Sequence, residues 1–67
     1  MLPRYEQYEK LRDERGDTDA KVARAIEINS SVLSHWKAKD YAPKVDKISK
    51  LASYFGVSLA YFYEEPS

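Results

Sequence analysis

Several residue types are scarce or missing in the chain, and their scarcity excludes whole classes of protein. Its 67 residues include no cysteine and one histidine, His35, so they offer no disulfide, no thiolate metal site and no histidine cluster for a catalytic zinc. Two glycines, Gly16 and Gly56, are too few for a phosphate-binding loop. No apolar run approaches the roughly 20 residues of a membrane-spanning helix. We therefore expect a small binding domain rather than an enzyme, with no catalytic residue, metal, cofactor or membrane association.

The chain also lacks net charge, which argues against a nucleic-acid partner. It has 11 basic and 11 acidic residues. Their distribution argues the other way, because residues 31–50 contain five lysines and two aspartates, a net charge of +3. A basic segment on a neutral chain can still present one positive face to DNA.

The positions of capping residues divide the sequence into short helices. Gly16 and Gly56 are typical of residues that directly follow a helix, and Thr18, Asn29 and Ser58 are good N-caps. No alternation of apolar and polar residues suggests a strand. The expected class is all-α, a compact bundle of five helices at about residues 4–15, 19–26, 30–38, 44–55 and 59–63.

One of these segments has a clear apolar stripe. Residues 44–55 carry Val45, Ile48, Leu51, Ala52 and Phe55 at spacings of three and four, which predicts an amphipathic helix with this face in the core.

Residues 19–38 contain two short helices joined by a link too brief for an antiparallel hairpin, so the helices must cross at a steep angle. The crossing needs a small residue where the backbones approach, and Ala23 is placed for this. Apolar side chains at Val22, Ile26, Leu33 and Trp36 would hold the pair together. This arrangement indicates a helix-turn-helix, whose second helix projects its polar face into the DNA major groove.

Six motifs stand in a characteristic order along the chain: Tyr8-Glu9-Lys10-Leu11-Arg12, Gly16-Asp17-Thr18, Ala23-Arg24-Ala25-Ile26, Leu33-Ser34-His35-Trp36, Pro43 and Leu51-Ala52-Ser53-Tyr54-Phe55-Gly56-Val57-Ser58. Through these motifs the chain resembles, from about residue 8 to residue 63, the Cro/repressor-type (XRE-like) helix-turn-helix domains of phage and bacterial regulators. The resemblance implies one lambda-repressor-like domain over residues 1–67, with the helix-turn-helix at about 19–38, that binds operator DNA as a dimer. It also implies a cytoplasmic protein that is bacterial or phage-encoded.

Three positions depart from the family pattern. Glu27 stands in the turn where the family often has glycine, which predicts a turn of different construction because glutamate tolerates a positive φ poorly. Lys37 replaces a glutamate that often pairs with the arginine at Arg12, so that pair is absent. Asp19 replaces a glutamine that often touches phosphate, and a carboxylate there would repel DNA.

The resemblance also assigns contact residues. We expect base contacts from small polar side chains on the second helix of the motif and backbone contacts from the loop that follows it. Three or four lysines on phosphates would give a log–log salt slope of about −3 per subunit. The base-contact candidates are Asn29, Ser30, Ser31, Ser34 and His35, and the backbone candidates are Lys37, Lys39, Tyr41 and Lys44.

Several of these residues have simpler interpretations. Asn29 is a plain N-cap in one of them, the lysines form a solvated face, and Trp36 is a core anchor rather than a surface on which a base stacks. The aromatic residues near the end of the chain either line a dimer interface or are ordinary, partly buried residues. These candidate interface residues are Tyr54, Tyr61 and Tyr63.

The sequence thus favours a sequence-specific transcriptional regulator, most like a phage-type repressor on a pseudo-palindromic operator. Its expected partners are double-stranded DNA and a second copy of the chain, with a weak dimer if the chain is the N-terminal part of a longer repressor. The alternative is a protein-interaction module with the same helical fold and no DNA readout.

Overall fold

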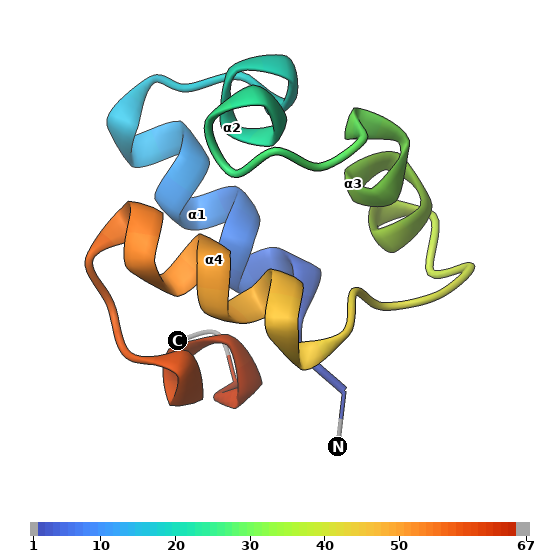
Figure 1. Cartoon of the computed structure of the whole chain (residues 1–67). Coiled ribbons are helices and arrows are strands. Elements are labelled where there is room, and N and C mark those ends of the chain that lie inside the picture. The colour runs from blue at the N-terminus through green and yellow to red at the C-terminus, as the bar shows by residue number, and fades with distance from the viewer. Residues whose placement is uncertain (1, 66–67) are drawn as a thin grey trace.

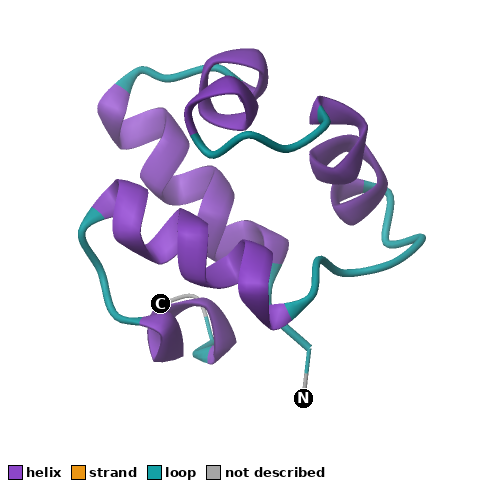
Figure 2. Cartoon of the chain, in the orientation of Figure 1, coloured by secondary structure: helices purple, strands orange, loops and turns teal. Residues whose placement is uncertain are grey.

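The computed structural model describes residues 2–65, and every regular element in that range is helical (Figures 1 and 2). The expected all-α class is confirmed, but the number of α-helices is four rather than five. The last element is a short 3-10 helix, in which the amide of Tyr61 donates to the carbonyl of Ser58 at 3.1 Å. The elements are α1 (Tyr5–Arg15), α2 (Asp19–Ala25), α3 (Ser30–Lys37), α4 (Val45–Phe55) and η1 (Leu59–Tyr63). None of these helices is long and apolar enough to cross a membrane.

The two ends of the described chain are fastened together. The amide of Arg4 donates to the carbonyl of Phe62 at 2.7 Å. The side-chain amide of Gln7 donates to the carbonyls of Tyr61 and Glu64, at 3.1 Å and 3.2 Å. Figure 1 shows η1 below α1 and α4, while α2 and α3 contact each other at the opposite side of the molecule. The pair α2–α3 therefore takes no part in the hydrogen bonds that join the two ends of the described chain.

Every element contributes to one apolar core. The expected stripe on α4 is confirmed for Ile48, Leu51 and Ala52, with Phe55 partly buried against them. The prediction is wrong for Val45, which is 57% exposed because it begins the helix beyond the edge of the core. The buried hydrophobic residues are Tyr5, Tyr8, Val22, Ala23, Ile26, Leu33, Trp36, Ile48, Leu51, Ala52 and Phe62.

All four α-helices are followed by a residue with a positive φ. The residue is glycine after α1 and α4, as expected, with φ of 71° at both Gly16 and Gly56. The residue with a positive φ is Glu27 (60°), two positions after the end of α2, and Lys39 (64°), two positions after the end of α3. The amide of Ile28 donates back to the carbonyl of Ala23 at 2.9 Å, as in a glycine-terminated helix. The prediction of a different turn at Glu27 is therefore wrong, because this glutamate itself adopts the left-handed conformation.

Replacing Glu27 by glycine should relieve this strain. A left-handed residue with a side chain costs roughly 1–2 kcal/mol, and the greater freedom of glycine in the unfolded chain offsets part of the gain. We expect Glu27→Gly to raise the free energy of unfolding by about 0.5–1 kcal/mol in urea titrations. Glu27→Ala removes the charge but keeps the strain and should give no gain, so equal effects of the two variants would contradict this account.

Candidate nucleic-acid interface

The helix α3 divides cleanly into a buried and an exposed face. Leu33 is fully buried and Trp36 is 3% exposed, with its indole stacked on the ring of Tyr8 at 5.7 Å between centroids. The indole Nε1–H donates to the carbonyl of Pro3 at 3.3 Å. Trp36 is therefore a core anchor, and the alternative of a base-stacking surface is wrong. Ala23 on α2 is buried in the core and α2 contacts α3, while the opposite face of α3 lies outside.

That outer face carries the small polar side chains that the sequence predicts. Ser30, Ser31, Ser34 and His35 are all exposed. Asn29 caps the helix, and its Oδ1 accepts a hydrogen bond from the amide of Ser31 at 2.9 Å. The capping interpretation of Asn29 is thus confirmed. Its amide nitrogen still offers donors to an outside partner, so a base contact remains a prediction.

The residues predicted to contact the DNA backbone lie at the end of α3 and in the loop that follows it. Lys37, Tyr41 and Lys44 are exposed, and within residues 2–65 neither Lys37 nor Lys44 forms an ion pair. Lys39 differs, because its Nζ lies 3.4 Å from the carboxylate of Glu6 on α1. Two of the three lysines therefore have their full charge available to a phosphate.

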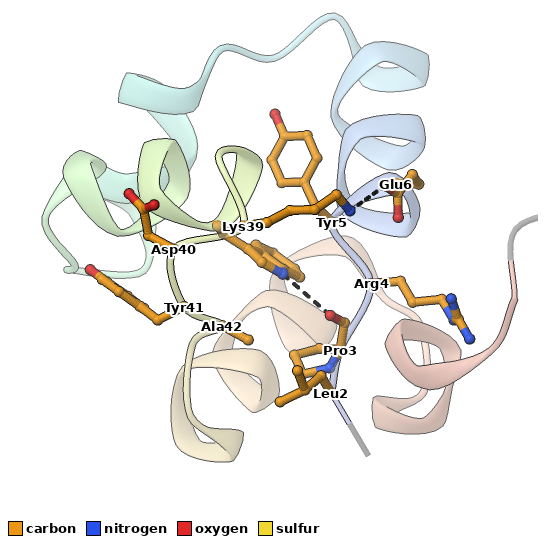
Figure 3. A pocket seen from close by; sticks show the side chains of 10 residues that line it. Leu2, Pro3, Arg4, Tyr5, Glu6, Lys39, Asp40, Tyr41 and Ala42 are labelled. Carbon is orange, nitrogen blue, oxygen red and sulfur yellow. Dashed lines mark hydrogen bonds and ion pairs between the residues drawn. The ribbon is translucent and has the colours of Figure 1, made fainter.

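A groove lies beside this loop and shows how the loop is attached to the core (Figure 3). It has a volume of about 490 Å³ between residues 2–6 and residues 39–42, with Trp36 on its wall. The hydrogen bond from Trp36 to Pro3 and the ion pair between Lys39 and Glu6 hold its two sides together. The exposed ion pair thus links the loop to α1, beside the buried contact of Trp36 with Pro3.

One contact in this region was missed by the sequence analysis. The Nδ1 atom of His35 lies 2.9 Å from a carboxylate oxygen of Asp40, and the imidazole stacks on the ring of Tyr41 at 5.2 Å. Asp40 lies five positions after His35, which is not a spacing that brings side chains together on a helix. The pair forms because Lys39 turns the chain back, so that the amide of Asp40 donates to the carbonyl of His35 at 3.0 Å.

The carboxylate of Asp19 at the start of α2 is held by two neighbours. Arg12 donates to its Oδ1 at 2.9 Å, and the hydroxyl of Tyr8 donates to the same atom at 2.6 Å. The hydrogen bond to Asp19 raises the pKa of Arg12 above its ordinary value, although partial burial opposes this. Burial, followed by the bond to Asp19, raises the pKa of the Tyr8 hydroxyl. Arg12 therefore keeps a carboxylate partner although Lys37 occupies the family's glutamate position, and the positive charge compensates the carboxylate expected to repel DNA.

Comparison with known proteins decides the family. Residues 9–62, which are most of the chain, match the helix-turn-helix family. The chain belongs to the helix-turn-helix family. Proteins of this family are DNA-binding regulators of transcription, not enzymes.

A solved structure has the same fold as this helix-turn-helix chain. It is a transcriptional regulator from Listeria innocua, with a TM-score of 0.78 and 17% sequence identity. The match covers 100% of this chain and 64% of the regulator, so the chain spans less than two thirds of that protein. A comparison with curated proteins gives no match.

Within the helix-turn-helix chain, the three tyrosines expected at a dimer interface make internal contacts. The hydroxyl of Tyr54 donates to Asp17 at 3.1 Å, and the guanidinium of Arg15 lies 4.7 Å from the centre of its ring. Tyr61 and Tyr63 are partly buried against the core. The simpler interpretation explains these contacts, and a role in a dimer stays a prediction.

The hydroxyl of Tyr54 donates to the buried carboxylate of Asp17, which stabilises the fold in its ionised form. Asp17 has a side chain only 2% exposed, and its oxygens lie 3.2 Å from both Arg15 and Lys21. Burial acts to raise the pKa of Asp17, but hydrogen bonds from Lys21 and Tyr54 and the nearby positive charges outweigh it and hold the pKa below its ordinary value. Because the pKa is lower in the folded chain, the ionised form contributes stability that acid removes.

Asp17→Asn should therefore lower the free energy of unfolding by a constant amount above about pH 5. The difference from the parent should begin to shrink as the pH falls past the ordinary carboxyl pKa of about 4, and it should vanish only below the lowered pKa of Asp17 in the folded chain. Urea titrations over a pH series test this, with the exposed Asp46→Asn as a matched control that shows little difference at any pH. Equal stability of Asp17→Asn and the parent at pH 7 would refute the assignment.

Proposed function

We propose that this helix-turn-helix chain is a sequence-specific transcriptional repressor that places α3 in the major groove of a pseudo-palindromic operator. The observation that carries the proposal is the division of α3. Its apolar side lies in the core, while its outer side presents the small hydroxyl groups of Ser30, Ser31 and Ser34, which form no side-chain hydrogen bond within residues 2–65. Small polar side chains on an otherwise uncharged helix face suit close approach to base edges.

The charge around α3 supports the same proposal. Lys37 ends α3, two positions after His35, and Lys44 lies at the N-cap of α4, so the two flank the loop on which Tyr41 is exposed. Lysines at these two positions would contact phosphates of the DNA backbone and so fix the register of α3 on the duplex. The expected division of labour is base reading by Asn29, the three serines and His35, and backbone contact by the loop.

A dimer would extend the readout to two half-sites. Two copies would place their α3 helices in successive major grooves about 34 Å apart, which requires an operator with approximate two-fold symmetry. Tyr54, Tyr61 and Tyr63, all partly buried, remain the proposed contact residues of this dimer.

The test is a selection of bound sequences from a double-stranded DNA pool with a random core, followed by titration of the best duplex at several salt concentrations. We expect an enriched motif of two inverted half-sites and a log–log salt slope near −3 per subunit. Random recovery of sequences, or an affinity that does not change with salt, would reject the proposal in favour of a protein-interaction module.

A further inference from the structure

We propose that Asp40 fixes the tautomer of His35 and so decides which bases α3 accepts at one position of the operator. This inference rests on the proposed function, since it concerns how the same face of α3 reads DNA. Asp40 would not touch the DNA base itself, so it is a positioning residue that acts through His35.

Two contacts hold the imidazole. Its Nδ1 atom lies 2.9 Å from the carboxylate of Asp40, and its ring stacks on Tyr41 with 25° between the ring planes. The turn at Lys39, with its positive φ, brings Asp40 to this place through a backbone hydrogen bond to His35. The position of the carboxylate is therefore set by the backbone and not by a mobile side chain alone.

The chemistry of the pair settles which ring nitrogen carries the proton. An ionised carboxylate only accepts hydrogen bonds, so the Nδ1 atom of His35 must be the donor. In a neutral imidazole the other nitrogen, Nε2, is then an acceptor. Without Asp40 the ring is free to protonate Nε2 instead, as free histidine prefers.

An acceptor at Nε2 favours particular bases. In the major groove, adenine presents an amino group at N6 and cytosine at N4, whereas guanine and thymine present acceptors at the corresponding edge. His35 should therefore select adenine or cytosine on the strand that it faces. A ring protonated at Nε2 would instead donate to acceptors on guanine, thymine or N7 of adenine, so the loss of one carboxylate outside the recognition helix would weaken the preference of a residue on that helix.

The tautomer can be measured directly because His35 is the sole histidine of the chain. A two-bond ¹H–¹⁵N spectrum at pH 8, where an ordinary imidazole is neutral, contains a single imidazole. We expect the Nδ1–H pattern in the parent and a change toward Nε2–H in Asp40→Ala. An Nε2–H pattern or a doubly protonated ring in the parent would overturn the proposal, whatever the DNA binding.

The second measurement is base preference. Binding of the best selected duplex is compared with duplexes changed at one base pair at a time, for the parent, Asp40→Ala and Asp46→Ala. The parent should favour adenine or cytosine roughly tenfold at one position, and Asp40→Ala should reduce this to about twofold. Asp46→Ala removes the same charge from an exposed site and should leave the preference intact while affinity for all duplexes rises equally.

The outcomes separate the two proposals. If the parent selects no DNA sequence, the proposed function fails even though the tautomer result stands. If the parent selects a sequence and Asp40→Ala keeps the full preference at every position, the function holds and the role of Asp40 is rejected.

Discussion

Replacing Lys37 and Lys44 together by glutamate should abolish operator binding without unfolding the chain. Each substitution removes a proposed phosphate contact and adds a repulsion, so we expect affinity to fall at least about a hundredfold and the salt slope to drop from about −3 to about −1 per subunit. Both residues are exposed and unpaired within residues 2–65, so the free energy of unfolding should stay within about 0.5 kcal/mol of the parent. Fluorescence anisotropy with the selected duplex measures the affinity and its salt dependence.

The matched control for this experiment is Lys10→Glu, compared with each lysine changed singly. Lys10 is exposed on α1, outside the face of α3, and its reversal changes the net charge by the same amount. It should weaken binding by no more than about twofold to threefold through the overall charge. If Lys10→Glu is as harmful as Lys37→Glu, the effect is one of net charge and the proposed backbone contacts are wrong.

The second large effect concerns the contact between Arg12 and Asp19. The Arg12 side chain is 17% exposed and donates to both Asp19 and the hydroxyl of Tyr5. Arg12→Ala leaves the carboxylate of Asp19 without its cation, and we expect a loss of about 2 kcal/mol, below the value for a fully buried pair because Asp19 is one-third exposed. Thermal and urea unfolding give this value.

Two further variants decide whether the pair itself is responsible. Arg4→Ala removes an exposed arginine that lies 3.6 Å from Glu65, and it should cost less than about 0.5 kcal/mol. In the double variant of Arg12 and Asp19 to alanine, the loss should be smaller than the sum of the single losses, because the second substitution removes the carboxylate left unpaired by the first. Strictly additive losses would show that the two residues do not interact.

The division of α3 was predictable because it follows from local spacing. Leu33 and Trp36 are three residues apart on one side of the helix, and Ser30, Ser31 and Ser34 stand at positions that fall on the other side, so a helix at this place has to separate the two sets. Gly16 and Gly56 were equally readable as helix ends, since glycine adopts the required conformation at little cost.

The features that the sequence did not reveal depend on the tertiary structure. Glu27 and Lys39 adopt conformations that their side chains disfavour, which the packing of α2 and α3 imposes. The contact between His35 and Asp40 could not be predicted from the sequence, because it depends on the turn at Lys39. The sequence predicts that the family's arginine–glutamate pair is absent because Lys37 stands at the glutamate position, but it does not predict that the fold brings Asp19 to the Arg12 guanidinium instead.

The central claim is that the outer face of α3 is the surface that meets DNA, and amide chemical shifts on titration with the selected duplex test it most directly. We expect the largest shifts at Ser30, Ser31, Ser34 and His35, with smaller ones along the loop to Lys44, and shifts on η1 only where two copies meet on the operator. Shifts concentrated on η1 or in the groove between residues 2–6 and 39–42, with α3 unaffected, would contradict the account.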